Sequence, residues 1–300
     1  MLDKQAFLES FHRGIHLLDG ATGTSLLQAG MPRGCCQEAW ILEHSEVIIQ
    51  LQRSYAEAGS EIIYAPTFQA NSLALSRYGL DADMASINTL LIALSKKAAP
   101  TCLIAGNLTT LRACMDTADK RNFDRMTDVY KRQIHALMQG GADLIAAETL
   151  LHPLEAKAVL HAAKEEGAFT VMISFALKAD GTLRSGHSAE AVFSELEQAG
   201  ASALGMNCIA ADDTLPMLVK RLKQHISVAL QAQYRKGRVR RSSCRSCHVH
   251  GRHASLHGKR RFPRRRMLRH DTRIYRRLKT YYSIKSKRPC VPSERKVVFS

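Results

Sequence analysis

Short apolar segments alternate with longer segments of helical spacing over the first 230 residues, and this alternation constrains the fold more than any other feature. In Ser45–Gly59, Met126–Gly141 and Ser188–Gly200, apolar residues recur every three or four positions and a glycine ends the segment, as at a helix C-terminus. Strands alternating with helices of this length predict βαβ units and a parallel sheet. The expected strands are Ile15–Asp19, Glu61–Pro66, Cys102–Asn107, Asp143–Glu148, Thr170–Phe175, Ala201–Asn207 and His225–Gln231.

Small or polar residues stand where these apolar segments end, and they bear on the choice between two α/β folds. A doubly wound open sheet can use seven strands, whereas a (β/α)8 TIM-type barrel needs eight. In a barrel the C-terminal strand ends form one mouth, so all of these side chains meet at one site, which an open sheet does not allow. We therefore favour the barrel, with its eighth strand unassigned. The strand-end residues are Asp19, Thr67, Asn107, Glu148, Ser174 and Cys208.

Charge divides the chain into two parts. Residues 231–300 contain 23 of the 43 lysines and arginines but only two of the 27 acidic residues, so the net charge of +16 comes from the tail. We expect a barrel body over residues 1–233 and a basic tail of low order over residues 234–300. No apolar run approaches the roughly 20 residues of a membrane span. The N-terminus lacks a signal-peptide pattern, so we expect no membrane association and a reducing, cytoplasmic location.

Three motifs follow predicted strands, and each has an ordinary structural explanation when taken alone. Asp19–Thr24 (DGATGT) has the residues of a tight turn, without the spacing of a phosphate-binding loop. Glu148 is placed to begin a helix, where carboxylates are favourable. Cys208 follows Gly-Met-Asn, and a single buried cysteine usually behaves as a small apolar residue.

In their order along the chain, these segments resemble the homocysteine S-methyltransferase family, which includes the homocysteine-binding module of methionine synthases. The resemblance covers about residues 14–231. Several spaced motifs in the right order are more specific than any one of them. They are Leu18–Thr24, Gly59–Asn71, Gly140–Ile145 followed by Glu148 and Thr149, and Gly205–Cys208.

The resemblance implies a (β/α)8 barrel that transfers a methyl group to the sulfur of L-homocysteine and forms methionine. In the family, three cysteine thiolates hold a zinc ion at the barrel mouth, and the substrate thiol takes the fourth position. Zinc lowers the pKa of that thiol and keeps it as the reactive thiolate. Cys208 matches one of the three zinc cysteines.

The same match assigns the other pocket residues and leaves the methyl donor open. Two carboxylates would receive the amino group of homocysteine, and the backbone around Gly20 its carboxylate. The donor is a methylcobalamin-bearing protein or domain, S-methylmethionine, or betaine, and a barrel acting on another thiol such as selenocysteine is a further possibility. The implied substrate-binding residues are Asp19, Gly20, Thr22, Glu148, Ser174 and Asn207.

The sequence departs from the family at the end of the barrel. The family's other two zinc cysteines lie in a Gly-Gly-Cys-Cys-Gly motif that ends the eighth strand, and this motif is absent here. Arg265–Tyr275 can be encoded by a set of allowed codons that has a second meaning. Read one base later, the same codons encode Gly-Gly-Cys-Cys-Gly-Met-Thr-Pro-Glu-Tyr, which contains the missing motif. We therefore interpret the tail as a frameshifted reading that begins near Tyr234, with a genuine basic extension as the alternative. In either case we expect weak zinc binding and little activity, because two thiolates are missing.

The remaining cysteines do not complete a zinc site in this interpretation. Cys35–Cys36 are expected to be non-ligands, and Cys102, inside the third strand, and Cys114 are expected to be structural. Cys244–Cys247 and the following histidine have the spacing of a haem attachment site or a zinc module. We predict neither, because haem attachment requires export and a small zinc module requires an apolar seed.

A competing hypothesis assigns the function to the tail. Lysine, arginine and interleaved aromatic residues over 234–300 are compatible with a protein that binds RNA or another polyanion beside a non-catalytic barrel. No RNA-binding motif is present, and runs of charge alone give nonspecific, salt-sensitive binding. Nucleic acid is therefore the less favoured partner.

Overall fold

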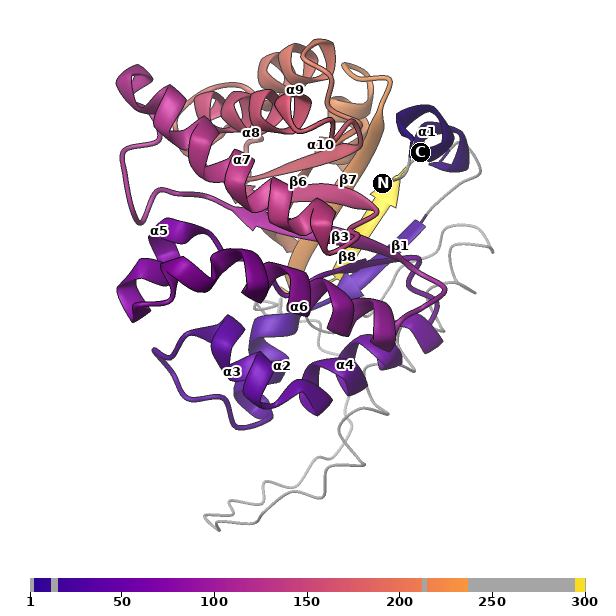
Figure 1. Ribbon diagram of the computed structural model, residues 1–300. Helices are drawn as coiled ribbons and strands as arrows, with labels where there is room; N and C mark the ends of the chain where they lie inside the picture. The colour runs from indigo at the N-terminus through magenta and orange to yellow at the C-terminus, as the bar shows by residue number, and fades with distance from the viewer. Residues whose placement is uncertain (1–2, 12–15, 212–214, 237–294, 300) are drawn as a thin grey trace, which may run out of the picture.

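The chain folds into a closed barrel wrapped by helices (Figure 1). The computed structural model describes residues 3–11, 16–211, 215–236 and 295–299. Within these ranges, each strand pairs with the next one in chain order, and β8 closes the barrel against β1. The expected TIM-type barrel is confirmed, and the open sheet is not observed.

The seven parallel strands overlap the seven segments expected from the sequence. Because the barrel buries both faces of each strand, these strands are continuous apolar runs rather than alternating ones. The last of them begins at Ala229 rather than at His225, which follows a helix end. The strands are β1 (His16–Gly20), β2 (Ile62–Tyr64), β3 (Leu103–Thr109), β4 (Leu144–Leu150), β5 (Val171–Ala176), β6 (Ala203–Ala211) and β7 (Ala229–Lys236).

The helices expected from apolar spacing are confirmed, and others fill the remaining connections. α4 and α7 pack on the outside of the sheet through the faces that the three- and four-residue spacing marked. The helices are α1 (Lys4–Phe11), α2 (Thr22–Gln28), α3 (Gln37–Glu43), α4 (Ser45–Glu57), α5 (Ser72–Leu75), α6 (Met84–Ala98), α7 (Phe123–Gln139), α8 (Pro153–Glu165), α9 (Ala189–Gln198) and α10 (Leu215–Lys223), with short 3-10 turns η1 (Ser76–Tyr78), η2 (Asp81–Asp83) and η3 (Lys120–Asn122).

Two apolar layers form the core. The larger layer lies between the strands and the surrounding helices. The smaller layer fills the barrel interior toward the N-terminal ends of the strands. Phe7 of α1 is fully buried in the smaller layer, against residues such as Leu18 and Ile62. α1 therefore closes the barrel at the N-terminal ends of its strands, and the opposite end remains available as a mouth.

The position of the eighth strand corrects one expectation. From the sequence we left the eighth strand unassigned and expected a tail of low order, which would leave the first and seventh strands as unpaired edges. Instead, β8 (Arg295–Phe299) pairs with β1 and β7 and is antiparallel to both. Its sequence, RKVVF, is rich in β-branched and aromatic residues, and pairing removes the two exposed edges.

The direction of β8 places its first residue at the mouth. Arg295 is the register partner of Gly20 and Tyr234, near the C-terminal ends of β1 and β7. A parallel eighth strand would instead end at the mouth. No helix within the described ranges is long and apolar enough to span a membrane.

Candidate functional site

A cavity of about 390 Å³ opens at the C-terminal ends of the strands. All five residues of Gly20–Thr24, together with Glu148, Thr149 and the Asn207-Cys208 pair, contribute to its wall. The barrel therefore brings together segments that lie far apart in the sequence. Of the seven predicted site residues, the cavity is lined by Gly20, Thr22, Glu148, Asn207 and Cys208.

Glu148 supplies the carboxylate on this wall. It lies in β4 and is largely buried, and Asn107 of the adjacent β3 donates from Nδ2 to its Oε1 over 2.9 Å. Thr109 of β3 also donates to the Glu148 backbone carbonyl over 3.0 Å. The bond from Asn107 orients the carboxylate, and the bond from Thr109 fixes the backbone that carries it.

Tyr64 of β2 connects the two predicted carboxylates. Burial raises the pKa of Tyr64 well above its ordinary value, and the nearby charges of Glu148 and Asp19 raise it further. Its hydroxyl donates to Gln231 Oε1 over 3.1 Å. Because its pKa is raised, the phenol stays neutral and acts as a hydrogen-bond donor. Tyr64 also lines the cavity.

Asp19 and Ser174 lie outside the cavity lining. Asp19 is fully buried and accepts a hydrogen bond from the Tyr64 backbone N–H over 3.1 Å. Ser174 of β5 is also buried, and its hydroxyl has no hydrogen-bond partner within the described part of the chain. The geometry therefore separates Glu148, on the cavity wall, from Asp19, which is buried and bonded to the Tyr64 backbone.

Asn207 ties together two residues with strained backbones. Thr149 and Cys208 have positive φ angles of 63° and 58°, which non-glycine residues adopt at a cost. Asn207 accepts from the Thr149 backbone N–H over 3.1 Å and donates to the Thr149 hydroxyl over 2.5 Å. It also approaches the Cys208 sulfur, with Nδ2 and Sγ 3.6 Å apart. This buried amide links the ends of β4 and β6, which flank β5, across the mouth.

The glycine-rich motif allows a close approach of the backbone to α4. A Cβ atom added at Gly20 would lie 2.7 Å from a ring carbon of Tyr55, so a side chain does not fit there. The Tyr55 hydroxyl donates to the Ala21 carbonyl over 3.2 Å. The segment that joins β1 to α2 is therefore held by Tyr55 on one side and lines the cavity on the other.

The cysteines of the described ranges do not assemble into a metal site. Cys208 is the exposed thiol of the mouth cavity, and no group of three or more His, Cys, Asp or Glu side chains in these ranges can hold a metal ion. Cys35–Cys36 line a neighbouring cavity of about 330 Å³. Cys102 precedes β3 rather than lying inside it, and donates to the Ser60 carbonyl. One thiolate does not fit the three-thiolate zinc site that the family resemblance implies. The Cys244–Cys247 motif lies outside the described residues.

From the sequence we assigned no role in this site to three residues that help to form it. Asn107 was recognised as a strand-end residue, but its bond to Glu148 follows from the pairing of β3 and β4. Tyr64 stands inside an apolar run, so nothing marked it as polar lining. Thr149 adjoins a predicted residue, and its left-handed backbone has no local signal because threonine rarely adopts it.

Comparison with known proteins agrees with this arrangement. A family model described as homocysteine S-methyltransferase matches residues 16–248. Crystal structures of the homocysteine methyltransferase MmuM from Escherichia coli are also similar. The metallated form is 26% identical with a TM-score of 0.66, covering 75% of this chain and 85% of that chain. The oxidized form is 25% identical with a TM-score of 0.63, covering 72% and 80%. On the family match, which spans most of its length, this chain belongs to the homocysteine S-methyltransferase family.

Proposed function

We propose that the mouth cavity binds L-homocysteine and that the chain's activity is transfer of a methyl group to the homocysteine sulfur, which yields methionine. One observation carries this proposal. Glu148, the Gly20–Thr24 turn and Cys208 line a single cavity in a chain of the homocysteine S-methyltransferase family. The first two suit the two charged ends of an amino acid, and the third marks where its sulfur would lie.

The amino group is assigned to Glu148. A carboxylate held by Asn107 and lining the cavity is a directed acceptor for an ammonium group. Asp19, bonded to the Tyr64 backbone N–H, contributes negative charge near the cavity without lining it. The substrate carboxylate is assigned to the backbone of Gly20–Thr24, which leads from β1 into the start of α2 and whose backbone N–H groups are the available donors.

The reaction requires the homocysteine thiol to lose its proton before it attacks the methyl carbon, because the thiolate is the nucleophile. The donor's bond to that carbon breaks and its electron pair leaves with the donor. We derive no step through zinc, since one cavity thiol does not fit the family's three-thiolate site. The proposal therefore includes slow turnover by this chain. The methyl donor is a corrinoid protein, S-methylmethionine or betaine.

Calorimetric titration of the full chain with L-homocysteine tests the binding step. Glu148→Gln should weaken binding roughly 10- to 100-fold, the value of a charged hydrogen bond. Glu46→Gln removes the same charge from the exposed surface of α4 and should leave binding unchanged. Equal affinity of Glu148→Gln and the unchanged chain would overturn the assignment of the amino group.

A methyl-transfer assay tests the reaction itself. Each donor class is supplied in turn with L-homocysteine, and methionine is measured. Formation of methionine with one donor, lost in Glu148→Gln, supports the proposal. If the chain binds homocysteine but forms no methionine with any donor, it is a homocysteine-binding protein, and the transferase assignment for this chain is refuted.

The RNA-binding alternative concerns residues 234–300, most of which lie outside the described ranges. No contact within the described part of the chain favours it. A salt titration of RNA binding with the full chain distinguishes it from the transferase proposal, because a tail acting through charge loses affinity steeply as salt rises.

A further inference from the structure

A second cavity, of about 300 Å³, lies between the starts of α8 and α9. We call it the histidine pocket, after His152 and His187, which line it. None of its lining residues lines the mouth cavity, so it is a separate site. Its size is at the lower end of the range for small-molecule sites.

The two histidine rings pack against each other, edge to face, in the lining of this pocket. Their ring centroids are 5.2 Å apart and the rings are nearly perpendicular. His152 Nδ1 accepts the Leu154 backbone N–H over 3.1 Å, so its other ring nitrogen carries a proton and is a donor. His187 Nδ1 contacts the Ser185 hydroxyl, which leaves Nε2 of that ring for a ligand.

Lysine side chains add positive charge to the same walls. Lys120 lines the pocket, and its side chain has no ion-pair or hydrogen-bond partner within the described residues. Lys157 is paired with Glu195, which also lines the pocket, over 2.5 Å. Glu195 is the acidic residue among those that line the pocket, and it is paired with Lys157. Lys120 and the two imidazoles can therefore bind a ligand.

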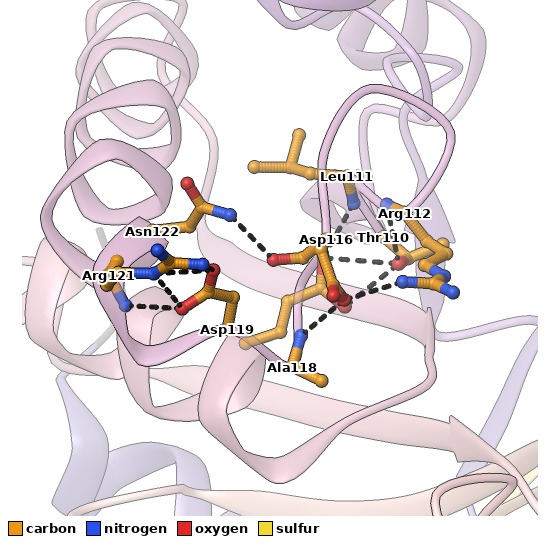
Figure 2. Close-up of polar contacts among 9 residues, drawn as sticks. Thr110, Leu111, Arg112, Asp116, Ala118, Asp119, Arg121 and Asn122 are labelled. Atoms are coloured by element: carbon orange, nitrogen blue, oxygen red, sulfur yellow. Dashed lines mark hydrogen bonds and ion pairs between the residues drawn. The ribbon is translucent and has the colours of Figure 1, made fainter.

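The loop between β3 and α7 holds one wall in place (Figure 2). Asp116 accepts from Arg112 over 2.6 Å and from the Ala118 backbone N–H over 3.1 Å, and Asp119 accepts from Arg121 over 2.8 Å. The arginines of this loop are therefore engaged within it. Ala118 and Lys120 reach the pocket from the braced segment, so the lysine is presented by a preformed wall.

We propose that the histidine pocket binds a phosphate-type anion, either inorganic phosphate or the phosphate group of a small ester. The side chains carry this inference, since His152 and Ser188 already cap the two helices. The starts of α8 and α9 add favourable partial charge for an anion. A tetrahedral oxyanion can accept from the Lys120 ammonium and both imidazoles at once. This site does not depend on the methyl-transfer assignment.

Titration of the full chain with inorganic phosphate, followed through the histidine ring protons by NMR, tests the site. Saturable shifts of the His152 and His187 signals are expected. Lys120→Gln and His152→Asn should each weaken binding at least about fivefold. Asparagine preserves a capping side chain for α8, so this variant should keep its fold.

Three results would overturn the proposal. Lys131→Gln removes an exposed lysine of α7 that pairs with Glu165, and serves as the charge control. If it weakens phosphate binding as much as Lys120→Gln, the effect is one of net charge. If phosphate binds but the two pocket variants leave its affinity unchanged, the anion occupies another place, such as the basic tail. An absence of saturable histidine shifts would equally refute the site.

Discussion

Removal of the Asn207 side chain tests whether the mouth of the barrel is held by one buried amide. Asn207→Ala deletes both hydrogen bonds to Thr149 and the contact with the Cys208 sulfur. Thr149 and Cys208 would then keep their left-handed backbones without this support. We expect a loss of stability together with a loss of order at the cavity wall.

The magnitude follows from the contacts. Two hydrogen bonds contribute about 1 kcal/mol each, and a Thr149 N–H left without its partner costs about 1 kcal/mol more. Asn207 is 1% exposed, so water does not simply replace the lost amide. Asn207→Ala should therefore lower the free energy of unfolding by about 3 kcal/mol. Asn207→Asp keeps the acceptor and loses the donor, and should cost about 1–2 kcal/mol.

Urea unfolding followed by circular dichroism measures these differences, and calorimetry measures homocysteine affinity in the same variants. Asn122→Ala is the matched control, because Asn122 makes a single side-chain bond, to the Asp116 carbonyl, in an exposed loop. It should cost no more than about 1 kcal/mol. If Asn207→Ala costs no more than the control and binds homocysteine equally well, the buried amide does not hold the site.

Three further outcomes are expected. Gly20→Ala forces a methyl group against Tyr55 and should cost about 1–3 kcal/mol in thermal melts, whereas Gly23→Ala, whose Cβ would meet nothing closer than 3.7 Å, should not. Burial raises the pKa of Glu38, so the folded state binds its proton more tightly and loses stability as pH rises from about 4 through the folded-state pKa. Glu38→Gln should remove the part of that decline that Glu38 causes, and equal free energies of unfolding of the unchanged chain at about pH 5 and about pH 7.5, measured in urea, would contradict this. Purified chain should contain well under one zinc per chain by mass spectrometry, with Cys208→Ala removing the remainder; tight stoichiometric zinc would refute the reasoning.

Most of the barrel could be predicted from the sequence because its strands are buried on both faces. Apolar runs such as Thr170–Phe175 are continuous and lie between long helical segments, so their existence depends on local pattern. β8 was missed because a five-residue strand inside a basic tail has no periodic neighbours. Its place is decided by the two open edges of β1 and β7, which are a tertiary property.

The site was predicted by motif, and its geometry was not. Glu148 and Cys208 follow strands, so the barrel brings them to one mouth. Whether a strand-end side chain faces the cavity depends on strand register, which a sequence does not specify. Asp19 shows this difference, since it is buried against the Tyr64 backbone and does not line the cavity.

The reversed direction of β8 also determines how this protein can be handled on a surface. Phe299 pairs with Leu230, near the beginning of β7, and α1 packs at the same end of the barrel. In Figure 1 the C-terminal mark lies beside α1. A tag or fluorophore attached after Phe299 would therefore sit at the end of the barrel opposite the cavity. Immobilised through that end, the protein presents its open mouth to solution, and a probe there reports on the barrel without touching a bound amino acid.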